Sequence, residues 1–352
     1  MAPSSPTVVL VIELGVDTFG DVTVDADGRP LHQAQVIRDV VEQGVLAEEV
    51  GLDFFGVGEH HREDFAVSAP DVVLTAVAAR TERIRLGSSV TVLSSDDPVR
   101  VFQRFSTLDA ISRGRAEVTL GRGSFTESFP LFGYDLADYE VLFSDKLDLF
   151  AALLRGGPVT WSGSTRPPLT GVTVHPPLES GTLRTWIGVG GSPESVVRAA
   201  SYGMPLMLAI IGGDPVRFAP FVELYHDALR EHGREPLPVG VHAPGHVAAT
   251  DEEARDRFFP HYQAMTARIG RERGWPPMTR AAYEAEVAEG ALFVGSPETV
   301  AAKIVRTARA LGLSRFDLKY SAGTLPDAAI RSCIELYGRE VAPAVREALS
   351  QA

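Results

Sequence analysis

The chain of 352 residues contains one cysteine, Cys333. A single cysteine excludes an internal disulfide and any metal cluster built from several thiolates. Basic residues are in the minority, with 33 Lys and Arg against 46 Asp and Glu, so the net charge is −13. This balance argues against a surface for nucleic acid or for an anionic membrane, because both attract basic proteins.

Long apolar runs are also missing from the N-terminal region. The stretch Val8–Leu14 is too short for the core of a signal peptide or for a membrane span, and no basic region precedes it. Apolar residues nevertheless make up 45% of the chain, which is ample for a large core. These observations predict a soluble, cytoplasmic, globular protein.

Short β-branched runs alternate with longer amphipathic runs eight times, which is the pattern of a parallel sheet. The pattern favours an α/β fold with a single (β/α)₈ TIM barrel over residues 1–352, and an open doubly wound sheet is the alternative. Two segments, 156–181 and 271–292, interrupt the pattern and are predicted to be insertions, the first with a hairpin and the second as a lid. The expected strands lie at 7–14, 54–58, 84–93, 115–120, 184–189, 205–211, within 239–250, and at 315–320.

Barrel enzymes carry their active sites at the carboxyl ends of the strands, so the residues that follow each strand are the candidates for chemistry. Glu59, His60 and His61 follow the second strand. Adjacent histidines on an extended chain point to opposite sides and are poorly placed to share a metal ion, and the sequence has no HExxH motif. No metal site is therefore predicted. One imidazole is expected to face the barrel mouth as a general base or hydrogen-bond donor.

Glycine-flanked polar residues follow two other strands. Gly190 and Gly191 allow close approach of a ligand, and Ser192 with the next helix start suits a phosphate, although an ordinary N-cap explains Ser192 equally well. Arg122, between two glycines, suits a phosphate or a ring carbonyl, and a surface salt bridge is the alternative. Together these residues indicate an anionic, phosphate-bearing ligand.

Four further polar residues lie on the late strands. His242 and His246 are expected to line the pocket at most. Asp317 and Lys319 share one face of the last strand, since alternate residues point to the same side. That face is either the inside of the barrel, where the two form a pair near the mouth, or the solvated outside.

Three segments carry a resemblance to a known family: GLDFFGVGEHH, RIRLGSSVTVLSSDDPVRVFQRFSTLDAISRGRAEVTLGRG and ALFVGSPETVAAKI. With them the sequence resembles the luciferase-like flavin-dependent monooxygenases, the family of the bacterial luciferase alpha subunit. The resemblance implies a barrel that binds reduced FMN at its carboxyl face, in a homodimer. It implies that His60 is catalytic, with Glu59 beside it, that Arg122 contacts the flavin, and that Ser192 binds its phosphate. The Ser89–Val90 bond falls where the family often has a non-prolyl cis peptide beside the flavin ring.

The function implied by this resemblance is that of a two-component monooxygenase. A separate flavin reductase would supply reduced FMN, and the barrel would use it with O₂ to oxygenate a small organic substrate. His60 would move or hold a proton, while Arg122 and the segment Gly190, Gly191 and Ser192 would hold the phosphate.

Two departures from the family pattern and two alternative functions limit this prediction. Luciferase has a reactive cysteine at Gly121 and an acid at Gly191, so emission of light is not expected. Relatives that use the deazaflavin F420 share the barrel, which makes an F420-dependent hydride-transfer enzyme the alternative. A flavin-storing protein without catalysis is the third reading.

Overall fold

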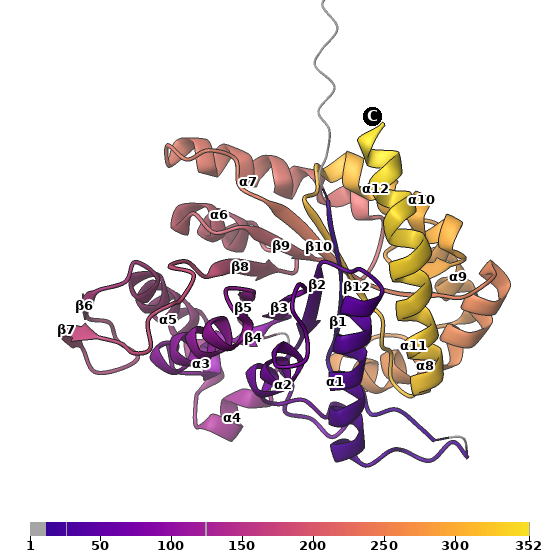
Figure 1. The fold of residues 1–352 in the computed structure, drawn as a ribbon, viewed down its shortest axis with the longest axis horizontal. Helices are drawn as coiled ribbons and strands as arrows, with labels where there is room; N and C mark the ends of the chain where they lie inside the picture. The colour runs from indigo at the N-terminus through magenta and orange to yellow at the C-terminus, as the bar shows by residue number, and fades with distance from the viewer. Residues whose placement is uncertain (1–11, 26, 124, 352) are drawn as a thin grey trace, which may run out of the picture.

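The computed structural model describes residues 12–25, 27–123 and 125–351 (Figure 1). Eight parallel strands pair in the order β1, β2, β3, β5, β8, β9, β10, β12, and β12 pairs again with β1. The sheet is therefore a closed (β/α)₈ barrel, as predicted, and the open-sheet alternative is wrong. The strands are β1 (Glu13–Thr18), β2 (Phe54–Val57), β3 (Arg85–Ser88), β5 (Ala116–Gly121), β8 (Arg184–Val189), β9 (Leu206–Ala209), β10 (Val239–Val247) and β12 (Arg315–Lys319).

Helices connect the strands and cover the outside of the barrel. Their starts follow local rules: the Asp97 side chain accepts hydrogen bonds from the Val99 and Arg100 amides, and Pro98 occupies the first helical turn, as predicted. Within the described residues, no helix is both long and apolar enough to cross a lipid bilayer. The covering helices are α1 (Gln33–Glu49), α2 (Pro70–Ala78), α3 (Pro98–Ser112), α5 (Tyr139–Leu154), α6 (Pro193–Tyr202), α7 (Ala219–Glu231), α8 (Asp251–Arg273), α10 (Pro297–Leu311), α11 (Asp327–Leu336) and α12 (Ala342–Ser350).

Both predicted insertions are structured. The first contains the antiparallel hairpin β6 (Pro158–Trp161) and β7 (Leu169–Thr173), which projects at the left of Figure 1. The second begins in the last turn of α8 and contains α9 (Arg280–Ala288). The predicted third strand, 84–93, is divided into β3 and β4 (Thr91–Val92). The short elements α4 (Ser128–Phe132) and β11 (Phe293–Gly295), which pairs with β10, were not predicted.

The first strand lies later in the chain than predicted. Residues 7–11 of the expected strand lie outside the described residues, and β1 continues to Thr18. Asp17 is therefore part of the strand rather than of the loop after it. Its main chain pairs with Gly56 on one side and Lys319 on the other, and the Asp17 side chain is fully buried.

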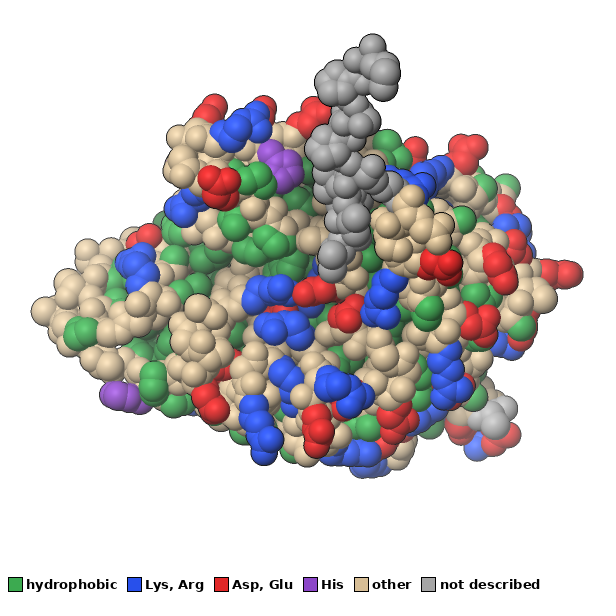
Figure 2. Space-filling view, turned by 45° about the horizontal axis from the view of Figure 1, so that its top comes forward, with side chains coloured by type: hydrophobic (Ala, Val, Ile, Leu, Met, Phe, Trp, Pro, Cys, Tyr) green, Lys and Arg blue, Asp and Glu red, His purple; other side chains and the backbone are tan. Residues whose placement is uncertain are grey.

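The amino end of the barrel interior is filled by ion pairs. Arg315 Nη1 lies 2.6 Å from Glu117 Oε2, and Arg184 Nη1 lies 2.8 Å from Glu13 Oε2. Burial opposes ionisation of Glu117, but Arg315, Arg85 and Arg184 lower its pKa to about 2. These side chains fill this end, so a ligand has room only at the carboxyl end. Acidic and basic side chains are interspersed on the molecular face in Figure 2, without a large patch of one sign.

Candidate active site

The carboxyl ends of the strands form the mouth of the barrel, and β2 delivers Glu59, His60 and His61 there. The His60 amide donates to Val67 O at 3.1 Å, which fixes the chain directly after the strand. The two imidazoles lie in different surroundings, as predicted from their adjacent positions on an extended chain.

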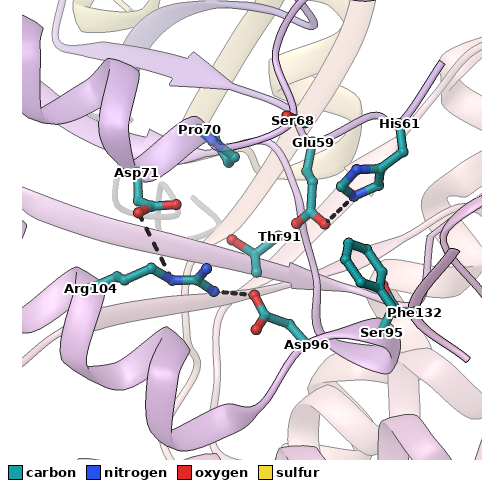
Figure 3. A pocket seen from close by; sticks show the side chains of 10 residues that line it. All are labelled: Glu59, His61, Ser68, Pro70, Asp71, Thr91, Ser95, Asp96, Arg104 and Phe132. Atoms are coloured by element: carbon teal, nitrogen blue, oxygen red, sulfur yellow. Dashed lines mark hydrogen bonds and ion pairs between the residues drawn. The ribbon is translucent and has the colours of Figure 1, made fainter.

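Glu59 and His61 form a pair in a cavity of about 170 Å³ beside α2 and α3 (Figure 3). Glu59 Oε1 lies 2.9 Å from His61 Nε2, and Glu59 Oε2 accepts from the Val92 amide at 3.0 Å. The Glu59 amide also donates to Val90 O at 3.2 Å. Glu59 therefore clamps the segment Val90–Val92 to the end of β2.

The opposite wall of this cavity carries a second set of charges. Figure 3 shows Arg104 between Asp71 and Asp96, with Arg104 Nε 3.9 Å from Asp71 Oδ2. Burial raises the pKa of the Asp71 carboxyl, and Arg104 opposes that rise. The cavity is lined by Glu59 but not by His60, so the two predicted catalytic side chains lie in different places.

The His60 ring lies among phenylalanine side chains. Its centroid is 4.7 Å from that of Phe19, 4.5 Å from that of Phe65 and 5.1 Å from that of Phe125. Burial lowers the pKa of His60 to about 3, so the imidazole is neutral near pH 7. Its Nδ1 lies 4.0 Å from Glu127 Oε1, beyond hydrogen-bond distance. A neutral imidazole in an apolar cage can accept or donate a proton in a place from which water is largely excluded.

The Ser89–Val90 peptide bond is cis, as the resemblance implied. Three glycines make room for this dipeptide, and we call Gly58, Gly121 and Gly188 the glycine arc. A Cβ at Gly58 would come within 2.7 Å of Ser89 O. A Cβ at Gly121 or Gly188 would come within 2.6 or 3.0 Å of a Val90 methyl group. The absence of a side chain at Gly121, where luciferase has cysteine, thus has a packing reason.

Arg122 and Ser192 lie near each other at the ends of β5 and β8. Arg122 and Arg198 both pair with Glu140, and the Arg122 guanidinium lies 5.3 Å from the Tyr139 ring centroid. The Ser192 hydroxyl donates to Glu194 Oε2 at 2.7 Å, and together with the charge of Arg122 it lowers the pKa of Glu194. The structural alternatives weighed for these residues are both present, because Arg122 forms an ion pair with Glu140 and Ser192 is the N-cap of α6.

The segment Gly190–Ser192 opens α6 as an N-cap. Ser192 Oγ accepts from the Ser195 amide at 3.3 Å. Gly191 has φ +118°, which a side chain would strain, and a Cβ at Gly190 would meet nothing within 4 Å. The backbone is therefore open to a ligand at the positive end of the helix dipole.

The other side of the mouth carries charged and polar side chains, of which the sequence analysis named His242 and Lys319 but not the partners that they contact. His242 Nδ1 lies 2.6 Å from Asp17 Oδ2, and Lys319 Nζ lies 2.8 Å from Asp21 Oδ2. We call Asp17, Asp21, His242 and Lys319 the charged arc. The side chains of all four are less than 10% exposed. The alternation of side chains along a strand indicates which of them share a face. It does not show which residues of neighbouring strands meet, because that depends on the strand register.

Asp317 and His246 do not join this arc. Lys319 pairs with Asp21 rather than with Asp317, which lies deeper in the barrel, 3.7 Å from Arg315 Nε. The interior location of both residues is confirmed, and their mutual pairing is wrong. His246 was expected to line the pocket, but it stacks on Phe258 of α8 at 5.6 Å, outside the barrel. The reason is that β10 changes partner from β12 to β11 after Pro244. In the described part of the chain, no three metal-ligating side chains converge.

The insertion 271–292 reaches the mouth through its first residues. Glu272 forms two hydrogen bonds with Arg62, at 2.5 and 2.7 Å. The guanidinium groups of Arg62 and Arg273 lie 4.6 and 4.7 Å from the Phe125 ring centroid. Phe125 in turn contacts His60, so this segment covers the cage. Trp275, in the same insertion, is 45% exposed.

Residues 18–315 match the family described as luciferase-like monooxygenase. The chain belongs to this family. The match contains six of the eight barrel strands in full and one residue each of β1 and β12, and it agrees with the resemblance found in the sequence.

Relatives in this family differ in how much of their length is matched. The alkanal monooxygenase alpha chain of Photorhabdus luminescens is 25% identical over 67% of this chain and 65% of its own length. An uncharacterized protein of Sinorhizobium fredii, y4vJ, is 30% identical over 58% of this chain and 55% of its own length. The chain thus spans less than two thirds of these two relatives. Limonene 1,2-monooxygenase of Rhodococcus erythropolis is 26% identical over 93% of this chain and 87% of its own length.

Solved structures share the fold. Monooxygenase RslO1 from Streptomyces bottropensis superposes with a TM-score of 0.82 at 22% identity, covering 94% of this chain and 99% of that one. The oxygenating constituent of 3,6-diketocamphane monooxygenase from Pseudomonas putida, in complex with FMN, gives 0.75 at 18%, with 95% and 99% covered. An F420-dependent secondary alcohol dehydrogenase gives 0.74 at 17%, with 96% and 99% covered. At these identities the similarity shows the barrel and not the cofactor.

Proposed function

We propose that the protein is an FMN-dependent monooxygenase that uses reduced flavin and O₂ to oxygenate a small organic substrate. The observation that carries the proposal is the arrangement at the ends of β2, β3, β5 and β8. It combines a neutral imidazole, a glycine-lined cis dipeptide, an arginine pair and an open helix N-terminus. Relatives named for an alkanal and for limonene support a small organic substrate.

The residues of this arrangement fit a flavin mononucleotide. Arg122 and Arg198, now paired with the exposed carboxylate of Glu140, suit a phosphate dianion, and the α6 N-terminus with Gly191 and Ser192 adds backbone donors. The glycine arc would allow a flat ring to approach Ser89 and Val90. When bound, reduced FMN supplies the electrons for O₂ activation.

In this proposal His60 is the catalytic residue that holds or moves a proton next to the flavin. Its phenylalanine cage excludes water, which keeps a reactive site from side reactions. Glu59 is a positioning residue in this proposal, because its carboxylate forms hydrogen bonds with the His61 ring and with the Val92 amide. The reductase partner, the homodimer and the cytoplasmic location rest on the family resemblance and on the net charge.

The phosphate assignment is tested with Arg122→Gln. We expect reduced FMN to bind the variant roughly 10- to 150-fold more weakly, the loss of a hydrogen bond to a charged group of about 1.5–3 kcal/mol. Binding of riboflavin, which lacks the phosphate, should not change. Both affinities are measured anaerobically by flavin fluorescence, with Arg29→Gln, on an exposed loop, as the matched control.

Two outcomes contradict the assignment. Equal losses for FMN and riboflavin would place Arg122 at the ring rather than at the phosphate. Tight binding of F420 with no binding of FMN would favour the F420-dependent hydride-transfer enzyme, whose fold this chain also shares.

A further inference from the structure

The imidazole of His242 is oriented by a carboxylate inside the barrel mouth. Asp17 and His242 come from β1 and β10, which are 225 residues apart in the chain, and their side chains meet at 2.6 Å. A carboxyl group normally loses its proton at lower pH than an imidazolium, so the shared proton belongs to Nδ1. The neutral ring then carries a lone pair on Nε2, which makes this nitrogen a base.

This Nε2 is available to a ligand. Among the described residues, only the Asp17 carboxylate bonds to the ring, through Nδ1, and the His242 side chain keeps 9% exposure at the mouth. The His242 ring stacks on the Phe19 ring, with centroids 5.9 Å apart, and the Phe19 ring also makes an edge contact with the His60 ring. Two imidazoles therefore flank one phenyl ring.

The two imidazoles differ in their suitability as bases. His60 lies among phenylalanines with its nearest carboxylate 4.0 Å away, so an imidazolium there would be poorly stabilised. His242 is hydrogen-bonded to a buried carboxylate whose other oxygen, Asp17 Oδ1, has no partner in the described part of the chain. A proton taken up at His242 would thus be stabilised by Asp17.

We propose that His242, oriented by Asp17, is a second catalytic residue that deprotonates an ionisable hydroxyl on a planar aromatic substrate, that is, a phenol. This inference rests on the proposed function and names its substrate class. In the step, the O–H bond of the substrate breaks, an Nε2–H bond forms, and the electron pair stays on the substrate oxygen as phenolate. No electrons are exchanged.

The aromatic surroundings support a planar ring as the substrate. Phe65 contacts both Phe19 and Phe125, with ring centroids 5.8 and 6.3 Å apart, and ring edges and faces favour aromatic partners. The charged groups that face His242 come from three strands. Asp17 lies on β1, and Asp317 and Lys319 lie on β12, while His60 follows β2 across Phe19. Burial raises the pKa of Asp317 well above its ordinary value, and the charge of Arg315 opposes that rise.

The test uses para-nitrophenol as the probe, because its phenolate absorbs visible light and its phenol does not. The probe is titrated into the flavin-free protein at a pH where free probe is protonated. We expect the bound probe to be ionised, with its apparent pKa lowered by at least about one unit, or tenfold in the ionisation constant. His242→Gln should abolish the shift, Asp17→Asn should reduce it, and His232→Gln, an exposed control, should leave it intact.

Several outcomes overturn the proposal. These are a probe that fails to bind the wild type, a bound probe that stays protonated, ionisation that survives His242→Gln, and equal affinity for para-nitroanisole, which lacks the proton. Circular dichroism and thermal unfolding verify that each variant is folded. Binding of reduced FMN is measured in parallel on the same samples. Loss of the phenol response with FMN binding intact rejects only this inference, whereas absence of FMN binding rejects the proposed function.

Discussion

The two sides of the barrel mouth are built from different kinds of residue. The glycine arc, at the ends of β2, β5 and β8, is uncharged, and its backbone lies bare against the cis dipeptide Ser89–Val90. The charged arc, from β10, β12 and β1, buries two pairs of charged or polar side chains. The first side is shaped by the absence of side chains, and the second by buried pairs of polar and charged side chains. We therefore expect the stability of the protein to fall when a side chain is added to the glycine arc or removed from the charged arc.

The largest effect is expected on the charged arc, for Lys319→Met. Lys319 Nζ lies 2.8 and 3.1 Å from the Asp21 oxygens, and both side chains are buried. Removal of one partner leaves a buried, uncompensated carboxylate, which costs about 3–5 kcal/mol. Urea unfolding should show this loss in the free energy of unfolding.

A double variant provides the control for this experiment. Asp21→Asn combined with Lys319→Met removes both charges and should recover most of the loss, because no unpaired charge remains. A cost below about 1 kcal/mol for Lys319→Met alone would show that the pair is not desolvated as the structure indicates.

On the glycine arc, the comparison is sharpened by Gly121→Ala. The new Cβ would come within 2.6 Å of a Val90 methyl group, and Val90 is β-branched and has little freedom to move. We expect a loss of about 1–3 kcal/mol in the free energy of unfolding, as for overpacking in a core. Gly190→Ala is the matched control, because its Cβ meets nothing within 4 Å, and its stability should stay within about 1 kcal/mol of wild type. Equal effects at both positions would remove the steric basis of the arc.

Near neutral pH, the smallest expected effect is a pH dependence that arises at His60. Its pKa is about 3 in the folded protein against an ordinary 6.5, so between these values the unfolded chain binds a proton that the folded protein does not. The stability is fully present above pH 6.5 and falls by about 1.4 kcal/mol per pH unit on acidification towards pH 3.

The variant that checks this linkage is His60→Gln. It should lose the part of the slope due to this group, measured by urea unfolding at several pH values. His246, whose pKa burial also lowers to about 3, makes a similar contribution outside the barrel, so the double variant His60→Gln with His246→Leu should flatten the profile further. A profile unchanged by His60→Gln would contradict the neutral, buried state of this ring.

The fold was largely predictable because its signals are local. The eight alternations of short and long apolar runs and the Asp97-Pro98 helix start predicted a barrel with helices in the right places. The different surroundings of His60 and His61 also followed from the alternation of an extended chain. The errors occurred where local pattern is ambiguous, as for the end of β1, which continues to Thr18, and for β11, which has three residues.

The site was predictable in part, for a similar reason. Residues such as Arg122 and Ser192 were recognisable because each follows a strand and is flanked by glycine. The role of Gly121 was not recognisable from the sequence, because it depends on a close contact with a Val90 methyl group from another part of the chain. The position of His246 was also wrong, because the change of strand partner after Pro244 has no clear mark in the sequence.

The sequence by itself determined the alternation of parallel strands and helices and the polar residues that follow the strand ends. Only the tertiary structure decided which of them meet: Asp17 with His242, and Asp21 with Lys319, 298 residues apart. The physical reason is that hydrophobic period and capping act over a few neighbouring residues. Contacts across a barrel depend instead on strand register and closure, which all eight strands fix together.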